Sequence, residues 1–150
     1  MNILLAIDSS PCSHSAVDSV LDRPWPAGTR FHLLSVIEPF HPEFAGWQPA
    51  YGPLAYEAQQ EQLSATQDLV KHEAERLSEA FGAENVSFAV VEGFIKDRII
   101  QAAQAWPAEL IIMGTHGRHG FEKLLLGSIS QAVMSSAPCS VEIVKSRKAS

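Results

Sequence analysis

The segment from Met113 to Ser130 carries the clearest chemical pattern in this chain. Two residues separate Gly114 from Gly117, and nine more separate Gly117 from Gly127 and the serine that follows it. Glycines let backbone amides approach a ligand closely, and the first turn of a helix presents unpaired N–H groups with a partial positive charge. Because an apolar strand precedes Gly114 and a helix is expected from residue 128, the segment is typical of a phosphate-binding site.

The charge of the chain narrows the class of ligand. The formal net charge is −6 at pH 7, which argues against nucleic acid, because that affinity depends on phosphates neutralised by Lys and Arg. The glycine segment nevertheless gathers His116, Arg118, His119 and Lys123. We therefore expect a small phosphorylated ligand at this local cationic patch, with the hydroxyls of Ser128 and Ser130 as further donors.

Strand-like and helix-like segments alternate along the chain, which predicts a parallel sheet. The expected strands are 2–7, 30–37, 86–91, 110–113 and 141–145, and the expected helices are 12–21, 54–81, 95–106 and 128–136. The long second helix is predicted to bury a stripe formed by Leu63, Val70, Ala74, Leu77 and Phe81, and to end at Gly82. At 150 residues the chain is expected to form one domain, 1–150, of the α/β class.

Composition argues against several other classes. Cys12 and Cys139 lie far apart and match neither a CxxC motif nor a zinc spacing, which suits a reducing compartment. The apolar run at 1–7 is too short for a signal peptide, and no run approaches the roughly 18 residues of a membrane span. The sequence therefore predicts a soluble, cytoplasmic protein with no membrane partner.

The chain resembles the universal stress protein family over nearly its whole length. The resemblance rests on four short motifs: Ala6-Ile7-Asp8-Ser9, Met113-Gly114-Thr115-His116-Gly117, Leu126-Gly127-Ser128-Ile129-Ser130 and Ala137-Pro138-Cys139-Ser140-Val141. Their glycine spacing, G-x2-G-x9-G-(S/T), marks the ATP-binding branch of the family. The resemblance implies a Rossmann-like, three-layer α/β/α sandwich of the adenine nucleotide alpha hydrolase-like type, with a five-stranded parallel sheet of order 3-2-1-4-5. Strands 1 and 4 are then neighbours, and ligands bind beyond their C-terminal ends, where the strand order reverses.

The resemblance also implies which residues bind the nucleotide. The ligand would be ATP, or ADP or AMP, with Mg²⁺ arriving only with the nucleotide. Ala6 and Asp8 would lie beside the nucleoside and Val36 would offer backbone contacts to adenine, while the glycines and serines hold ribose and phosphates. The full implied set is Ala6, Ile7, Asp8, Val36, Met113, Gly114, His116, Gly117, Arg118, Gly127, Ser128, Ile129 and Ser130. Gly93 matches another family glycine, although Phe94 and Ile95 depart from the usual pattern after it.

The leading functional interpretation is an adenine-nucleotide-binding domain that responds to stress or to the nucleotide state of the cell. The chain has no GxxxxGK(S/T) motif and no evident general base, so no residue is predicted to be catalytic, although slow ATP hydrolysis stays compatible with the sequence. The alternative is a nucleotide-independent homodimer that pairs the edge strand from Val141 to Lys145, as family members commonly do. An electron-transfer or nucleotide-modifying enzyme is less favoured, because its cofactor signature is missing. The sequence identifies no downstream partner.

Several residues keep two interpretations. Asp8 either lies beside the nucleoside or only caps the following helix, for which Ser9, Ser10 and Ser13 are alternatives. The glycines either cradle phosphate or only permit positive φ in a tight loop. His116 and His119 are interpreted as facing phosphate or solvent rather than metal, since no third ligand accompanies them.

Two further features stay open. Cys12 near a helix start is either an ordinary thiol or a redox-active one, whereas Cys139 is expected to be buried and inert. The aromatic and proline-rich segment from Glu38 to Pro53 is either an ordered surface loop or a lid or partner surface.

Overall fold

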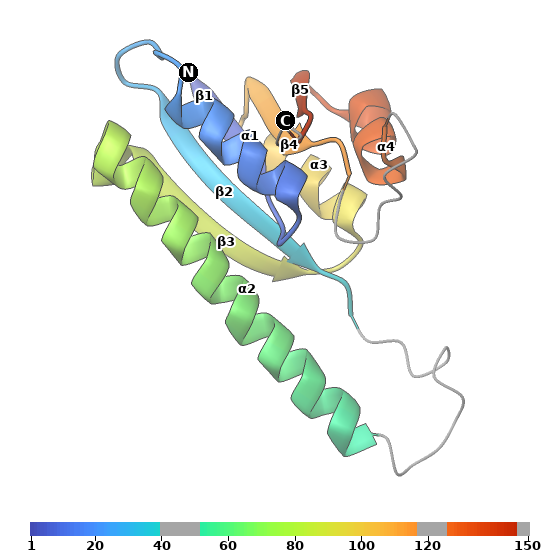
Figure 1. Cartoon of the computed structure of the whole chain (residues 1–150). Coiled ribbons are helices and arrows are strands. Elements are labelled where there is room, and N and C mark those ends of the chain that lie inside the picture. Colours follow the sequence, from blue (N-terminus) through green and yellow to red (C-terminus); the bar gives the residue numbers. More distant parts are fainter. Residues whose placement is uncertain (40–51, 117–125, 147–150) are drawn as a thin grey trace.

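The computed structural model describes residues 1–39, 52–116 and 126–146 (Figure 1). Within these residues, five parallel strands form one sheet of order β3-β2-β1-β4-β5, as the sequence and the family resemblance predict. The strands are β1 (Asn2–Ala6), β2 (Arg30–Ile37), β3 (Val86–Glu92), β4 (Leu110–Gly114) and β5 (Ser140–Val144). The helices are α1 (Pro11–Leu21), α2 (Gly52–Phe81), α3 (Ile95–Ala105) and α4 (Ser128–Ser136), with a short 3-10 turn, η3 (Ala83–Asn85), before β3.

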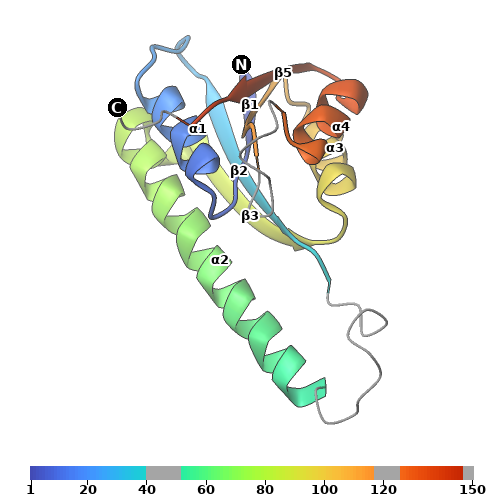
Figure 2. The same cartoon turned by 45° about the vertical axis from the view of Figure 1, so that its right-hand side comes forward.

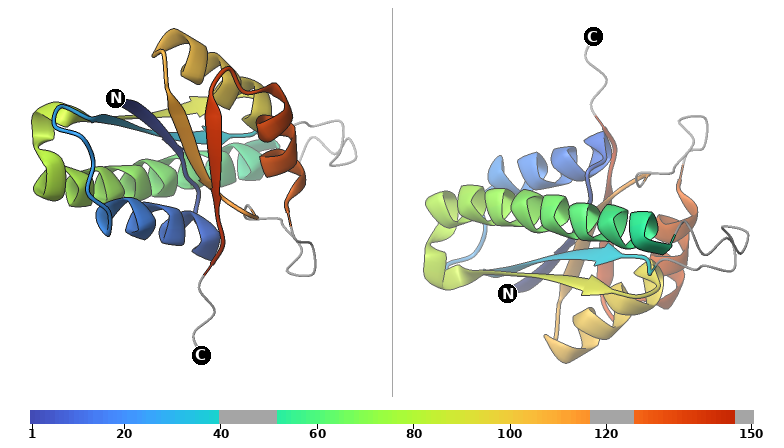
Figure 3. Two further views of the ribbon diagram at one scale, coloured as in Figure 1. Left: turned by 90° about the horizontal axis from the view of Figure 1, so that it is seen from above. Right: turned by 90° about the horizontal axis from the view of Figure 1, so that it is seen from below.

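The helices cover both faces of the sheet and give three layers. Figure 3 shows α1 and α2 on one face and α3 and α4 on the other. Each face has its own apolar cluster, and alternate strand residues enter different clusters, as the two-residue period of a strand requires. Ile3 and Leu5 of β1 join the α1/α2 side, whereas Leu4 joins the α3/α4 side. The central strands are therefore apolar on both faces, which is typical of a parallel sheet.

Helix α2 is the longest element, and only its C-terminal half lies over the strands (Figures 1 and 2). The predicted stripe is confirmed at Val70, Ala74 and Leu77, which are buried, and Phe81 stacks on Phe31 with ring centroids 4.7 Å apart. Leu63 is only partly buried, because that part of α2 extends beyond the strands. The stripe therefore anchors the C-terminal half of the helix.

Most element boundaries lie within one or two residues of those expected. Gly82 follows α2 with a positive φ of 95°, in agreement with a C-terminal glycine. Helix α1 begins one residue early, at Pro11, because proline suits the first position of a helix. Strand β5 runs one residue earlier than expected, over Ser140–Val144.

Two further predictions concern the segment from Glu38 to Pro53 and the absence of a membrane span. Residues 40–51 of the segment from Glu38 to Pro53 lie outside the described residues, so its role stays a prediction. Among the described helices, none combines the length and apolarity needed to cross a bilayer.

Candidate functional site

The C-terminal ends of β1 and β4 lie side by side, which brings several predicted residues together. Ala6 pairs with Met113 across these strands. Both side chains, and that of Val36 at the end of β2, pack on the α3/α4 side of the sheet. The side chain of Ile7 instead joins the α1/α2 cluster. The C-terminal ends of β1 and β4 thus carry apolar side chains on their α3/α4 side, of which Met113 is buried and Ala6 is part-buried.

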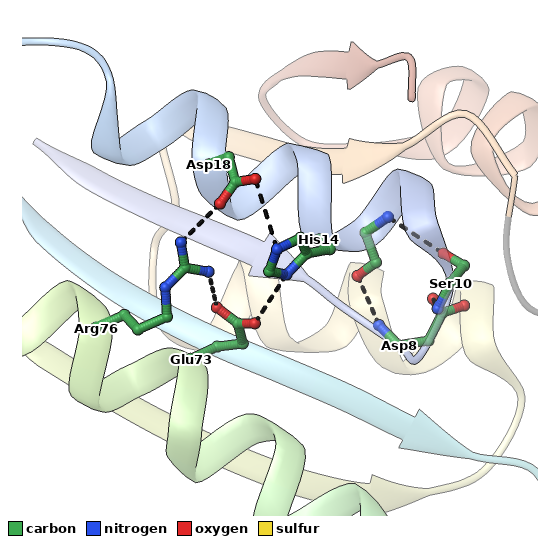
Figure 4. Close-up of polar contacts among 7 residues, drawn as sticks. Asp8, Ser10, His14, Asp18, Glu73 and Arg76 are labelled. Carbon is green, nitrogen blue, oxygen red and sulfur yellow. Dashed lines mark hydrogen bonds and ion pairs between the residues drawn. The ribbon is translucent and has the colours of Figure 1, made fainter. Parts of the chain in front are cut away.

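The turn between β1 and α1 is closed by its own side chains (Figure 4). Asp8 N donates to Ser13 Oγ over 2.8 Å, and Ser10 N donates to Asp8 Oδ1 over 2.8 Å. Ser13 N donates to Ser10 Oγ over 3.2 Å, which makes Ser10 the N-cap of α1. Asp8 is therefore not the helix cap, and its carboxylate holds the turn that precedes the cap.

Two glycines at the β4–α4 connection sit where a side chain would collide with backbone. A Cβ built on Gly114 would lie 2.7 Å from the carbonyl carbon and the Cβ of Cys12. A Cβ built on Gly127 would lie 2.7 Å from the carbonyl oxygen of Thr115. Because neither of these two glycines has a positive φ, the observed reason for glycine is close backbone approach rather than left-handed conformation.

Helix α4 begins immediately after Gly127, as the sequence predicts. Gly127 is its N-cap, and among the residues that the structure describes no side chain caps the first turn. Ser128 at the start of the helix is exposed, whereas Ser130 is buried. Amides at such a helix start favour an anion, because they point outward with the positive end of the helix dipole.

The hydroxyl of Ser130 holds the ends of the connection together. Ser130 Oγ donates to the carbonyl oxygens of Gly114 and Thr115 over 2.9 and 3.0 Å. Gly127 N also donates to the Thr115 oxygen, over 2.7 Å. In this structure the Ser130 proton thus serves the protein backbone, and its predicted donation to phosphate stays a prediction.

His116 is the last described residue before the gap in the connection. Its Nε2 atom is buried and, within the described part of the chain, has no hydrogen-bond partner. A buried polar atom without a partner is costly, so a ligand acceptor or donor beside it would stabilise the site. The other predicted residues of this connection, Gly117 and Arg118, lie outside the described residues, together with His119 and Lys123.

Thr115 belongs to the site although the sequence prediction omits it. It is 3% exposed, and its backbone N and Oγ1 both donate to Val144 O of β5, over 3.0 and 3.2 Å. Oγ1 also lies 3.6 Å from Cys12 Sγ. The sequence does show a hydroxyl residue directly after the glycine that ends a strand. It does not show the hydrogen-bond partners of Thr115, because Val144 and Cys12 are distant in sequence.

A charge network joins α1 to α2 on the opposite face of the sheet (Figure 4). Glu73, whose side chain is 5% exposed, contacts His14 Nδ1 over 3.2 Å and Arg76 Nη1 over 2.7 Å. Arg76 also pairs with Asp18 over 2.7 Å. Hydrogen bonding to Asp18, with that to Glu73, raises the pKa of the Arg76 guanidinium. This network ties α1 to α2, on the helix whose first turn follows Asp8.

A pocket of about 340 Å³ lies beside this network. Its lining includes the apolar Ile7, Val17 and Leu69 and the carboxylates of Asp8 and Glu73. Ile7 and Val17 belong to the α1/α2 cluster, whereas Ala6, Val36 and Met113 belong to the other face. The pocket therefore reaches the end of β1 from the α1/α2 side of the sheet, and Asp8 is part of its lining.

The two cysteines are poorly placed for redox chemistry. Cys12 is buried beneath Thr115, which limits access of an oxidant to its sulfur. Cys139 is part-buried, and burial raises the pKa of its thiol, which disfavours the reactive thiolate. At Cys12 the burial favours the interpretation as an ordinary thiol over a redox-active one. At Cys139 the raised pKa agrees with the inert thiol that was expected.

Comparison with sequence families gives one clear match. The model of the universal stress protein family matches residues 1–145. A universal stress protein of Thermus aquaticus, described by its position in the QAH/OAS sulfhydrylase 3′ region, is 32% identical over 143 residues, which cover 95% of this chain and 97% of the relative.

Other curated relatives match over a shorter stretch. Universal stress protein MJ0531 of Methanocaldococcus jannaschii is 36% identical over 73 residues, 49% of this chain and 42% of the relative. Universal stress protein A homolog 2 of Coxiella burnetii is 41% identical over 83 residues, 53% of this chain and 56% of the relative. The matched region thus spans about half the length of these two proteins.

Solved structures share the fold at low sequence identity. Protein MJ0577 superposes with a TM-score of 0.83 at 22% identity, over 99% of this chain and 97% of that chain. A universal stress protein family protein of Arabidopsis thaliana with AMP bound gives 0.68 at 14% identity, over 99% and 93%. A universal stress protein in complex with cAMP gives 0.60 at 20% identity, over 98% of both chains.

Proposed function

This chain belongs to the universal stress protein family, and on that premise we propose that it binds an adenine nucleotide at the C-terminal ends of β1 and β4. We propose further that it acts as a regulatory domain, whose interactions follow the bound nucleotide. The observation that carries the proposal is the start of α4. Its N-cap is Gly127, which has no side chain to accept from the first amides, and the carbonyl oxygen of Thr115 lies too close to Gly127 for a Cβ to fit. A phosphate would complete that helix start.

The residues present fit the phosphate end of the ligand. Gly114 and Gly127 keep side chains away from the ends of the connection, and Ser128 adds an exposed hydroxyl at the helix start. His116 Nε2 offers a buried polar atom that would gain a partner from a phosphate or ribose oxygen. Gly117 and Arg118 are proposed to complete the phosphate contacts, by family resemblance.

The nucleoside end fits the neighbouring strands. Ala6 and Val36 are part-buried apolar side chains on the α3/α4 side of the sheet, beside the buried Met113, and a purine ring is proposed to lie against them. Asp8 stands at the end of β1 and is proposed to accept hydrogen bonds from the ribose. The relatives with AMP bound and in complex with cAMP support this choice of ligand. Preference among ATP, ADP and AMP is part of the experiment below.

Binding, rather than catalysis, is the proposed activity. Among the described residues, no three His, Cys, Asp or Glu side chains gather as a metal site. Mg²⁺ is therefore proposed to arrive with the nucleotide, held mainly by phosphate oxygens and water. The backbone amides of the α4 start, the hydroxyl of Ser128 and the imidazole of His116 are proposed to position and orient the ligand.

Calorimetric titration of nucleotide-stripped protein with ATP, ADP and AMP, each with and without Mg²⁺, tests the proposal. Wild-type protein is expected to bind at least one nucleotide with micromolar affinity. Asp8→Ala is expected to lower that affinity by about tenfold, because it removes both the carboxylate proposed to accept from the ribose and the acceptor of the part-buried hydrogen bond from Ser10 N. Asp8→Asn is the matched control, since its amide oxygen can still accept from Ser10 N, the bond that Asp8 Oδ1 makes over 2.8 Å.

The second candidate function is a nucleotide-independent homodimer. Strand β5 stands last in the sheet order, at an edge, and edge strands readily pair with another chain. The two candidates give different outcomes in the titration. Heat that depends on nucleotide supports the binding proposal, whereas a folded protein that gives no heat and has a dimer mass by light scattering contradicts it and favours the second.

A further inference from the structure

Thr115 occupies the point where β4, β5, α1 and α4 meet. Its N and Oγ1 donate to Val144 O at the end of β5, over 3.0 and 3.2 Å. Its Oγ1 lies 3.6 Å from Cys12 Sγ in the first turn of α1. Its carbonyl oxygen accepts from Gly127 N and Ser130 Oγ of the α4 start, over 2.7 and 3.0 Å. One buried residue thus contacts the proposed phosphate site and the edge strand at once.

From this geometry we infer that Thr115 is a positioning residue that couples the nucleotide site to the edge strand β5. The inference rests on the proposed function and adds to it a route by which the bound state reaches a surface of the molecule. Because coupling is reciprocal, ordering β5 also favours the nucleotide-binding arrangement of the α4 start.

The hydroxyl of Thr115 is the part that makes this connection specific. A backbone pair between strands forms with any residue at this position, whereas Oγ1 adds a second donor to Val144 O and the contact with Cys12. The side chain is nearly fully buried, so a lost hydrogen bond is not replaced by water. The hydroxyl thereby fixes the rotation of the Thr115 peptide, whose carbonyl faces Gly127.

The α4 side of the connection leaves little freedom. The Thr115 oxygen already lies 2.7 Å from Gly127 N, and Gly127 is the N-cap whose neighbouring amides would face phosphate. A small displacement of this carbonyl moves both the cap and the Ser130 hydroxyl. Phosphate bound at the α4 start would therefore restrain Thr115, and through its two donors to Val144 it would restrain the end of β5.

Thr115→Val tests the inference, because valine keeps the branched shape of threonine and removes the hydroxyl. Thr115→Ser is the matched control, because serine keeps the hydroxyl. Calorimetry is expected to show affinity reduced about five- to tenfold in Thr115→Val and little changed in Thr115→Ser. Amide hydrogen exchange at saturating nucleotide supplies the second measurement. Nucleotide is expected to slow exchange both at 127–131 and at 140–144 in wild type and Thr115→Ser, but only at 127–131 in Thr115→Val.

Exchange without nucleotide separates this inference from the proposed function. In the ligand-free protein, Thr115→Val is expected to speed exchange at both 127–131 and 140–144, with α2 unchanged. Wild type that binds no nucleotide would overturn the proposed function, while this ligand-free comparison still tests the coupling. Slowed exchange in β5 of nucleotide-saturated Thr115→Val, or ligand-free changes confined to one of the two segments, would overturn the inference.

A second variant keeps the test decisive if Thr115→Val does not fold. Ser130→Ala removes the hydroxyl that donates to Gly114 O and Thr115 O, but leaves the bonds between Thr115 and Val144. It is expected to weaken the nucleotide effect on exchange at 140–144. An undiminished effect on β5 would contradict transmission through the Thr115 carbonyl.

Discussion

Helices α1 and α4 both begin at the C-terminal edge of the sheet, but their first turns are satisfied differently. At α1, Ser10 accepts from Ser13 N, and Asp8 accepts from Ser10 N. At α4, Gly127 is the N-cap, and no described side chain caps the helix. The start of α1 is thus satisfied by its own chain, whereas the start of α4 is suited to an external anion.

The difference between the two helix starts lies in the choice of the cap residue. Serine at a cap supplies an acceptor for the early amides, while glycine supplies none and lets the backbone come close. Ser130, which lies within the first turn of α4, is turned back onto the carbonyls of Gly114 and Thr115. A serine hydroxyl therefore accepts from an early amide of α1, whereas the serine hydroxyl in the first turn of α4 donates to strand-end carbonyls, and the early amides of α4 are proposed to face phosphate.

Gly127→Ala should give the largest effect on this comparison. The added Cβ would lie 2.7 Å from Thr115 O, a backbone atom that cannot easily move. We expect the free energy of unfolding to fall by about 1–3 kcal/mol and nucleotide affinity to fall by more than about tenfold, because the first turn of α4 is displaced. Denaturant unfolding and calorimetry on the same preparation measure the two quantities.

The control for this variant is Gly28→Ala. Gly28 has φ 81°, and nothing lies within 4 Å of its added Cβ. Its cost of about 1–2 kcal/mol comes from backbone strain alone, and nucleotide affinity should be unchanged. Wild-type affinity in Gly127→Ala would show that close backbone approach at α4 is not needed for binding.

The serine that caps α1 and the exposed serine that opens α4 offer a smaller, paired test. Ser10→Ala removes the α1 cap and should lower the free energy of unfolding by about 1 kcal/mol, with nucleotide affinity unchanged. Ser128→Ala should leave stability within about 0.5 kcal/mol, because the residue is exposed, and should weaken binding about threefold. Denaturant unfolding and calorimetry measure both variants. Weaker nucleotide binding in Ser10→Ala together with lower stability in Ser128→Ala would contradict the roles assigned to the two helix starts.

Substitution of His32 is expected to have the smallest effect, a change in the pH dependence of stability. Because His32 lies on β2, away from both helix starts, it is a control for them. Burial lowers the pKa of its imidazole, and its Nδ1 lies 2.7 Å from Ser87 Oγ. Since the unfolded pKa is about 6.5, the unfolded chain binds the proton more readily, and stability is lost as pH falls below about 6.5. His32→Gln should flatten the pH dependence of thermal stability below about pH 6.5, equally with and without nucleotide. A slope identical to that of wild type would exclude His32 as its source.

The sequence predicted much of the fold because its signals are local. Alternating apolar segments located the strands, and the stripe of Val70, Ala74 and Leu77 located the buried half of α2. The glycine pattern located the β4–α4 connection and the start of α4 at residue 128. Strand order came through the family resemblance, since periodicity alone does not state which strands are neighbours.

The side-chain roles within the site were less predictable. Sequence left open whether Asp8 caps α1, and the structure assigns the cap to Ser10. Ser130 was expected at phosphate, but its proton is shared between two backbone carbonyls. Thr115 was omitted, although it contacts Val144, 29 residues away, and Cys12, 103 residues away. Each outcome depends on which hydrogen-bond partners the packed strands bring within reach.

The sequence by itself determined the alternation of elements, the apolar faces and the position of the glycine-bearing connection, because these follow from periodicity and from the backbone freedom of glycine. Only the tertiary structure decided that Gly114 must accommodate Cys12 and that Thr115 joins the α4 start to β5. The physical reason is that parallel register sets these contacts: Ala6 beside Met113 and Gly114 beside Val144 place distant segments within hydrogen-bonding distance.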